Sequence, residues 1–525
     1  IPNEIKRELA RKKARFFIIN ATELAKEVGL GNRTNTIMQS AFFYLTQVIP
    51  YEEAKDYMKD YAEKTYGRKG HDVVEKNWAA VDKGTEGLEE IPVDPSWADL
   101  PVNEEIIESN KPEFVKRIAD PVNAIKGYDL PVSAFIGYED GTFENGTTHY
   151  EKRGIAVDVP EWQPDMCIQC NQCAYVCPHA VIRPFLIDEK EMAAAPEGMP
   201  TIKAIGKGFE NLQFKIQVSP LDCTGCGSCV NVCPAPKGKA IVMKPIDSQL
   251  ERKEDVNTDY LFNNVTYKDK IMGKATVKGS QFAKPLFEFS GACAGCGETP
   301  YVKLVTQLFG ERMMIANATG CSSIYGGSAP STPYTTNSCG EGPAWASSLF
   351  EDNAEYGYGM FQAVNTVRHR IAKLMTECES EVAPELADLF VEWRENINDG
   401  DKTTELRDKM IPLLEKETGA KAKEILELKQ YLVKKSIWMF GGDGWAYDIG
   451  YGGLDHVLAS GDDVNILVLD TEVYSNTGGQ SSKSSRTGAV AKFAASGKPV
   501  KKKDLAAILM TYGNIYVAKV SMGAN

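Results

Sequence analysis

The stretch Cys167-Ile-Gln-Cys170-Asn-Gln-Cys173-Ala-Tyr-Val-Cys177-Pro178 decides the fold at the centre of this chain. A second stretch, Cys223-Thr-Gly-Cys226-Gly-Ser-Cys229-Val-Asn-Val-Cys233-Pro234, repeats its spacing. Three cysteines separated by two residues each lie on one tight loop and can bind three irons of a cubane, while the cysteine before the proline reaches the other cubane. The doubled pattern therefore predicts two [4Fe–4S] clusters.

This spacing is typical of a bacterial-type ferredoxin, a small α+β domain with two clusters. The crossed ligation defines two sets of ligands: Cys167, Cys170, Cys173 and Cys233 for one cluster, and Cys223, Cys226, Cys229 and Cys177 for the other. A set of zinc knuckles is the alternative interpretation. It predicts CxxC pairs with histidines among them and no trailing Cys-Pro.

Composition narrows the class of protein. The 525 residues are 43% hydrophobic and 25% charged, which is ordinary for a globular chain of three or four domains. The net charge of −13 makes nucleic acid an unsuitable partner. No apolar stretch is long enough to span a membrane, and no signal peptide is visible. Because cluster ligands must stay thiolates, we expect a cytoplasmic protein rather than a secreted disulfide framework.

The order of patterns along the chain predicts a multidomain α/β protein. We expect an α/β domain over residues 1–106, a linking segment over 107–145, the ferredoxin domain over 146–264, and a second α/β domain over 265–525. A charged, helix-periodic stretch at about 381–435 is predicted to be an inserted helical arm. In the first domain we expect a strand over Phe16–Ile19, a helix that begins after Asn20, and helices over Met38–Leu45 and Tyr51–Tyr66.

The ends of the chain also lead to an expectation. It begins at Ile1 and stops at Asn525, just after a strand-like stretch from Asn514 to Val520. We therefore expect the sequence to be a piece of a larger protein.

A second group of motifs predicts a diphosphate and metal site. The strand Ser436–Phe440 runs into Gly441-Gly442-Asp443-Gly444-Trp445, and a helix is expected from Ala446 to Leu458. The next strand, Val464–Leu469, runs into a polar loop from Asp470 to Gln480. Ligands bind at the carboxyl ends of strands in open α/β sheets, and Mg²⁺ accepts one carboxylate with neutral oxygens.

Gly-Asp-Gly followed by such a loop is the pattern of thiamine diphosphate sites. Asp443, Thr471 and the Val473 carbonyl are the expected Mg²⁺ ligands, although asparagine is more usual where Thr471 stands. An ordinary turn between strand and helix is the alternative.

A third group of cysteines is incomplete. Cys293, Cys296 and Cys321 are one thiolate short of a cubane. Either they are a CxxC pair and an unrelated thiol, or they hold a third cluster whose last ligand lies beyond Asn525. Cys339 and Cys378 match no ligand spacing, and His179 is expected at the surface.

Five segments together resemble one known family: Cys293-Ala-Gly-Cys-Gly-Glu298, Ala318-Thr-Gly-Cys-Ser322, Gly442-Asp-Gly-Trp445, Asp470 to Gln480, and Asn32-Arg-Thr-Asn-Thr-Ile-Met-Gln-Ser-Ala-Phe-Phe43. With the two ferredoxin stretches before the thiamine motifs, the chain resembles the pyruvate:ferredoxin (flavodoxin) oxidoreductases. The resemblance implies a fragment that lacks the N-terminal 2-oxoacid domains and the extreme C-terminus.

The resemblance also implies an activity of pyruvate synthase type in anaerobic metabolism. Pyruvate and coenzyme A would yield acetyl-CoA and CO₂, and three [4Fe–4S] clusters would carry electrons to ferredoxin or flavodoxin in a cytoplasmic homodimer. Glu298 and Asn476 would be catalytic. The implied contacts with thiamine diphosphate are Glu298, Cys321, Gly442, Asp443, Gly444, Trp445, Thr471, Glu472, Val473, Tyr474, Ser475 and Asn476, and those with coenzyme A are Asn35 and Asn77.

Two other functions stay open from the sequence. The first is an oxidoreductase for another 2-oxoacid, since the substrate domain is not in this sequence. The second is an iron–sulfur electron-transfer module in which the thiamine fold is only a scaffold. In either case we expect the fragment alone to be inactive as an enzyme.

Overall fold

The computed structural model describes residues 1–101 and 111–523. The chain divides into two compact units, Ile1–Asn110 and Lys111–Asn525. Within the described residues we find no helix with the length and hydrophobicity of a membrane span.

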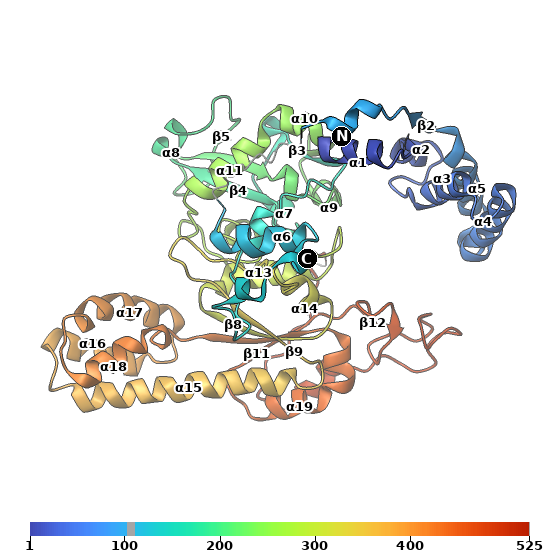
Figure 1. Ribbon diagram of the computed structural model, residues 1–525. Coiled ribbons are helices and arrows are strands. Elements are labelled where there is room, and N and C mark those ends of the chain that lie inside the picture. Colours follow the sequence, from blue (N-terminus) through green and yellow to red (C-terminus); the bar gives the residue numbers. More distant parts are fainter. Residues whose placement is uncertain (102–110, 524–525) are drawn as a thin grey trace. The chain divides into compact units, whose positions relative to one another are not determined.

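The first unit is a small helical assembly with a two-stranded antiparallel ribbon (Figure 1). Its helices are α1 (Asn3–Arg11), α2 (Ala21–Glu27), α3 (Asn35–Thr46), α4 (Tyr51–Tyr66) and α5 (His71–Glu86), and its strands are β1 (Phe16–Ile19) and β2 (Leu88–Ile91). The predicted strand and the three predicted helices are confirmed, and the Asn20 side chain caps α2 by accepting from the Glu23 N–H. Helices α3 and α5 approach closely at Gly84, where a Cβ would lie 2.4 Å from the Cβ of Ser40.

The predicted linking segment is partly folded. Residues 107–110 lie outside the described part, but the π-helical turn Val115–Ala119 and α6 (Asp120–Asn123) follow. Phe114, Val115 and Ile118 form a small buried cluster there. Apolar spacing in a stretch rich in proline and glycine was too irregular to predict these short turns.

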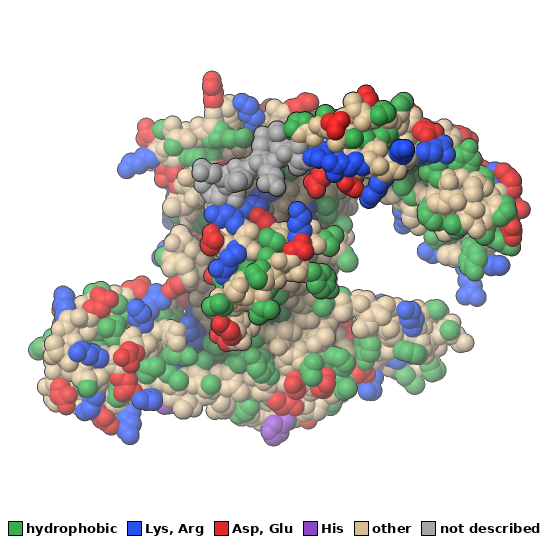
Figure 2. All heavy atoms as spheres, viewed as in Figure 1, with side chains coloured by type: hydrophobic (Ala, Val, Ile, Leu, Met, Phe, Trp, Pro, Cys, Tyr) green, Lys and Arg blue, Asp and Glu red, His purple; other side chains and the backbone are tan. Residues whose placement is uncertain are grey.

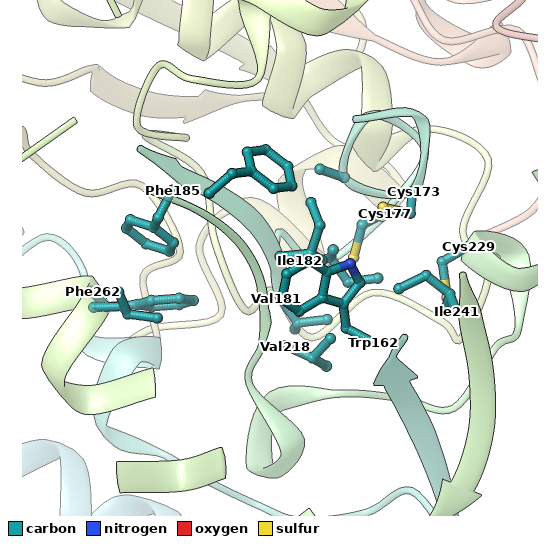
Figure 3. Close-up of a cluster of buried hydrophobic side chains, with 14 of the residues drawn as sticks. Trp162, Cys173, Cys177, Val181, Ile182, Phe185, Val218, Cys229, Ile241 and Phe262 are labelled. Atoms are coloured by element: carbon teal, nitrogen blue, oxygen red, sulfur yellow. The ribbon is translucent and has the colours of Figure 1, made fainter. Parts of the chain in front are cut away.

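The cysteine-rich domain combines two short antiparallel sheets. β3 (Asp158–Trp162) pairs with β7 (Ile241–Pro245), and β6 (Gln213–Val218) pairs with β4 (Ile182–Ile187) and with β5 (Ile202–Lys203). Each cysteine triplet leads into a short helix, α7 (Gln172–Tyr175) or α9 (Ser228–Val232). Figure 3 shows Cys173, Cys177 and Cys229 among buried apolar side chains such as Trp162, Ile182 and Ile241. The other helices of this region are α8 (Glu189–Ala193), α10 (Ile246–Glu251), α11 (Glu254–Asn264) and α12 (Val277–Ser280).

A four-stranded parallel sheet organises the rest of the second unit. Its strands lie in the order β11 (Asn465–Val468), β10 (Ser436–Gly441), β8 (Met313–Ala318) and β9 (Ala344–Ser348). Its helices include α13 (Thr299–Phe309), α14 (Cys321–Gly326), α19 (Tyr451–Ala459) and α20 (Leu505–Met510), and a two-residue hairpin pairs β12 (Val473–Tyr474) with β13 (Gln480–Ser481). The multidomain α/β class, with a ferredoxin-type domain before an α/β thiamine-type domain, is confirmed.

Two predictions about elements in this region need correction. The helix expected from Ala446 to Leu458 is a π-helical turn, Gly444–Ile449, followed by α19. The break falls at Gly450, where a Cβ would lie 2.3 Å from the Phe350 carbonyl oxygen. The strand-like stretch from Asn514 to Val520 has no regular secondary structure, because apolar residues alone do not provide a neighbouring strand.

The predicted helical arm exists and is larger than expected (Figure 1). α16 (Pro384–Glu395), α17 (Gly400–Leu414) and α18 (Ala420–Glu427) share a core with the end of the long helix α15 (Asn353–Cys378). Cys378 is buried in that core, as a structural role requires. Charged side chains of both signs cover the arm (Figure 2). The finer domain boundaries stay a prediction.

The separate core of the arm predicts a local effect of mutation. Phe390→Ala should destabilise the arm by about 3–5 kcal/mol, because a large buried side chain is replaced by a cavity. Amide hydrogen exchange should accelerate in α16–α18 and stay unchanged in β8 and β10. Val391→Ala, the neighbouring exposed position, is the matched control. Equal acceleration in both variants would contradict a separately packed arm.

Candidate functional site

The cysteine-rich domain contains two small cavities, and each is lined by four cysteines. Cys167, Cys170, Cys173 and Cys233 line the first, together with Trp162 and Ile241. Cys177, Cys223, Cys226 and Cys229 line the second, together with Pro160 and Met243. Each cavity therefore takes three cysteines from one stretch and the fourth from the other. These are the two sets that the crossed spacing predicts.

Backbone N–H groups point at the sulfurs in equivalent places. The Gln169 N–H donates to Cys167 Sγ and the Gly225 N–H to Cys223 Sγ, both at 3.4 Å. The Ala240 N–H donates to Cys233 Sγ at 3.3 Å. Such donors favour thiolate over thiol and are one way in which proteins tune iron–sulfur clusters.

Burial opposes the same thiolates. It raises the pKa of Cys223 to about 12 and that of Cys173 well above its usual value. Buried anions of this kind require a positive charge, and the irons of a cluster provide it. Within the described ranges, no three His, Cys, Asp or Glu side chains are placed to hold a single metal ion. The quartets fit a four-iron cluster, whose thiolates bind separate irons, better than one zinc ion.

The third group of cysteines also comes together. Cys293 and Cys296 lie on the loop before α13, and Cys321 begins α14 immediately after β8. Burial, together with the charges of Glu298, Cys296 and Cys293, raises the pKa of Cys321 to about 11. The described residues thus bring together the three ligands that the sequence predicts for this place.

The third group lies next to the second quartet. Gly295, between Cys293 and Cys296, has a φ of +72°, and a Cβ on it would lie 3.6 Å from the Cβ of Cys226. A side chain there would be both strained and in contact with a cysteine of the quartet. The backbone of the third group therefore packs directly on the second quartet.

His179 reinforces this contact, and its predicted surface position is wrong. The side chain is only 2% exposed. Its Nδ1 lies 3.1 Å from the Ser290 carbonyl and its Nε2 3.3 Å from the Cys293 carbonyl. The Phe289 N–H donates to the carbonyl of His179 itself. Sequence analysis missed this burial because the covering segment lies more than a hundred residues further along the chain.

The predicted Mg²⁺ ligands converge at the carboxyl ends of β10 and β11. Asp443 Oδ1 accepts from the Thr471 N–H at 3.0 Å, and Thr471 Oγ1 lies 3.3 Å from Asp443 Oδ1 and 3.0 Å from the Val473 carbonyl oxygen. Asp443 is 2% exposed, and burial raises its pKa. No cation pairs with Asp443 among the described residues. One buried carboxylate beside two neutral oxygens is a donor set that fits Mg²⁺.

Two serines in this site were not predicted. Ser482 Oγ and Ser484 Oγ donate to Asp443 Oδ2 at 3.0 and 3.1 Å. The Lys498 ammonium holds their loop by donating to the carbonyls of Ser482, Lys483 and Ser485. The run of serines after Gly478-Gly479-Gln480 was a visible signal, but the predicted loop stopped at Gln480.

Glu298 connects the third cysteine group to the diphosphate site. It directly follows the Cys293–Cys296 loop and is 9% exposed. Burial raises its pKa, the hydrogen bond from Tyr325 opposes the shift, the charge of Asp443 adds to it, and the resulting pKa is about 7. The Tyr325 hydroxyl donates to Glu298 Oε2 at 3.0 Å. Glu298 can therefore exchange a proton near neutral pH.

The other predicted thiamine contacts differ in their surroundings. Trp445 is a core residue: its ring would lie 2.5 Å from a Cβ at Gly441, and its Nε1–H has no acceptor among the described residues. The Tyr474 hydroxyl donates to Asp448, the Ser475 hydroxyl to Thr471, and Glu472 accepts from Arg486. Asn476 is exposed on the loop. Gly442 joins the end of β10 to Asp443, and Gly444 begins the π-helical turn that follows Asp443.

The predicted coenzyme A residues lie near each other in the first unit. Asn35 begins α3, and Asn77 is 5% exposed on α5. The next residue of α3, Thr36, donates from Oγ1 to Asn77 Oδ1 at 3.3 Å. A role in binding coenzyme A stays a prediction.

Four family models match successive parts of the chain. Residues 1–87 match pyruvate ferredoxin/flavodoxin oxidoreductase, 102–156 a domain of unknown function, 166–236 a 4Fe-4S dicluster domain, and 418–524 the C-terminal TPP-binding domain of thiamine pyrophosphate enzymes.

Curated relatives match the chain from end to end. It is 55% identical to the pyruvate:ferredoxin oxidoreductase of Moorella thermoacetica and 52% identical to the pyruvate-flavodoxin oxidoreductase of Klebsiella pneumoniae. Both alignments cover 100% of this chain and 45% of the relative. The chain belongs to the pyruvate:ferredoxin/flavodoxin oxidoreductase family. It spans about half the length of these relatives.

Two further comparisons involve proteins with other names. The pyruvate dehydrogenase [NADP(+)] of Cryptosporidium parvum is 45% identical over 100% of this chain and 30% of that protein. A solved 2-oxoglutarate:ferredoxin oxidoreductase from Magnetococcus marinus aligns at 14% identity with a TM-score of 0.22, over 42% of this chain and 51% of that one, which is too low to establish a common fold.

The crossed quartets predict how cysteine substitutions combine. Cys167→Ala and Cys233→Ala should each cost one cluster, about four irons per chain. The double variant should lose no more, because both cysteines line one cavity. Cys167→Ala with Cys177→Ala should lose about eight irons, because these line different cavities. Iron analysis after anaerobic purification measures this, with Cys339→Ala as the unchanged control. Loss of about eight irons in the first double variant and of about four in the second would contradict the crossed ligand sets.

The buried carboxylate predicts a second result. Asp443→Asn should weaken binding of Mg²⁺–thiamine diphosphate by at least about 100-fold, or about 2.7 kcal/mol, because the metal loses its only carboxylate. Titration calorimetry on the protein measures it. Asp463→Asn, before the opposite end of β11, is the control. Equal affinity of the two variants would exclude Asp443 as a ligand.

Proposed function

We propose that the protein containing this chain oxidises pyruvate with coenzyme A to acetyl-CoA and CO₂ and transfers the electrons to ferredoxin or flavodoxin. One observation carries the proposal: the diphosphate site, the third cysteine group and the two quartets are neighbours in that order. Glu298 links the Asp443 site to the Cys293 loop, Gly295 packs on Cys226, and the quartets exchange their fourth cysteines.

The residues of the diphosphate site suit thiamine diphosphate with Mg²⁺. When bound, this cofactor supplies an electron sink at a carbonyl-derived carbon. Asp443, Thr471 and Val473 would hold the metal, and Ser482 and Ser484 would orient the carboxylate of Asp443. Glu298 would hold a proton on Oε1, because Oε2 already accepts from Tyr325. Cys321, beside Glu298, would place the nearest cluster ligand at the same site.

The proposed route for electrons is short. The Cys293 loop packs against the second quartet at Gly295, and the buried His179 ring lies 3.3 Å from the Cys293 carbonyl oxygen. Cys173 and Cys177 lie on one turn of chain but line different cavities. Three clusters in this order would carry single electrons from the thiamine site to the protein surface.

Substrate and acceptor come from relatives and are part of the proposal. The relatives are named for pyruvate, with ferredoxin, flavodoxin or NADP⁺ as the partner. A cytoplasmic homodimer, coenzyme A binding near Asn35 and Asn77, and catalytic help from Asn476 also belong to the proposal. An electron-transfer module without thiamine chemistry is the competing function, and the unpaired buried Asp443 argues against it, since a scaffold has no need of that charge.

The activity can be tested on the complete protein. Anaerobic reduction of a low-potential dye should require pyruvate, coenzyme A and thiamine diphosphate together. 2-Oxoglutarate in place of pyruvate is the control for substrate class, and purified ferredoxin and flavodoxin then replace the dye. Dye reduction that does not require thiamine diphosphate would favour the electron-transfer module. A protein that binds iron but not thiamine diphosphate would favour it as well. The chain by itself should bind iron and show no pyruvate oxidation.

A further inference from the structure

Lys303 is a buried lysine that the proposed reaction does not use. It lies on α13, the helix that begins directly after Glu298 and the Cys293–Cys296 loop. Its side chain points into the cysteine-rich domain, and the residue is 1% exposed. A buried ammonium is costly unless anions or several acceptors surround it.

The direct partners of Lys303 are backbone carbonyls. Nζ donates to the Tyr175 carbonyl at 2.9 Å and also to the Ala174 carbonyl. Both belong to α7, the turn between Cys173 and Cys177. Among the described residues no carboxylate pairs with Lys303, whereas the buried Lys215 and Arg183 pair with Glu254 and Glu288. The charge of Lys303 therefore lacks the usual neutralising group.

Cysteines of both quartets act on Lys303 electrostatically. Burial lowers the pKa of Lys303, the charges of Cys177 and Cys173 oppose that shift, the charge of Arg183 adds to it, and the resulting pKa is about 8. Cys177 lines one cavity and Cys173 the other. The ammonium thus lies against the turn of chain that joins these two cysteines.

We propose that Lys303 is the buried counter-charge shared by the two ferredoxin-type clusters, and that it raises the reduction potential of both. This inference rests on the iron–sulfur part of the proposed function and is independent of pyruvate, coenzyme A and thiamine diphosphate.

The physical reason is the change of charge on reduction. A [4Fe–4S] core of charge +2 with four thiolates carries −2, and one electron from an external reductant brings it to −3. A fixed positive charge in a medium of low dielectric constant stabilises the more negative state. Because Lys303 is held on the turn between Cys173 and Cys177, which line different cavities, its charge would favour placing an electron on either cluster. Lys303 lies on α13, which begins just after the third cysteine group. The same helix therefore positions both the ammonium and the cysteines from which electrons would arrive.

The test is a potentiometric titration with dithionite, followed by electron paramagnetic resonance, on the anaerobically purified protein. Lys303→Gln keeps N–H donors for the two carbonyls and removes the charge. We expect the ratio of reduced to oxidised cluster to fall about tenfold at a fixed potential, a shift of 59 mV for one electron. Lys303→Arg keeps the charge and should stay near the wild type. Lys278→Gln is the matched control: Lys278 lies near Cys167 and Cys170 but is partly exposed, so solvent screens it and the shift should be smaller.

The outcomes separate charge from packing. Full iron content and unchanged potentials in Lys303→Gln would overturn the proposal. Loss of iron in Lys303→Gln together with retention in Lys303→Arg supports the counter-charge, while loss in both variants would assign Lys303 to packing and overturn it. Because dithionite supplies the electrons, a failure of pyruvate oxidation leaves this result unaffected.

Discussion

Buried polar contacts between the cysteine-rich domain and the parallel-sheet domain are the constraint on which the site depends. Arg183 of β4 pairs with Glu288, Lys303 of α13 donates to α7, and His179 faces the carbonyls of Ser290 and Cys293. Each group is almost fully buried, so each must keep its partner or lose several kcal/mol, on the order of 3–5 for a broken buried pair. These contacts leave little freedom in the spacing of the cysteine groups.

The parallel sheet provides the second constraint. Because its four strands run in the same direction, their carboxyl ends share one edge, and the loops after β8, β10 and β11 meet there. Cys321 follows β8, Asp443 follows β10 and Thr471 follows β11. A metal-binding carboxylate and a cluster ligand thereby come close in space, although 122 residues and the whole helical arm separate Cys321 from Asp443 in sequence.

Much of the site was predictable because its ligands recur at short spacing. The two cysteine quartets and the pair Asp443 and Thr471 follow from patterns of a few residues around a turn, and the structure brings each set together. The run of serines after Gln480 was visible in the sequence, but its contact with Asp443, the burial of His179 and the break at Gly450 were not predictable. They depend on segments far apart in sequence, for which a single chain carries no periodic signal. The sequence also did not assign α15 to the arm, because one end of this helix packs in the core of the sheet and the other end in the core of the arm.

The sequence by itself determined the chemistry available to this protein: eight cysteines in crossed ferredoxin spacing, three more near a glutamate, and a Gly-Asp-Gly turn followed by a polar loop. Local geometry is enough there, because a tight loop or a strand end positions ligands within a few residues. Only the tertiary structure decided which cysteine groups are neighbours, which buried carboxylate faces no cation among the described residues, and where the buried ammonium of Lys303 lies. Those properties depend on distances and burial across the whole fold. The sequence does not distinguish a carboxylate or lysine that faces water from one that faces a cluster.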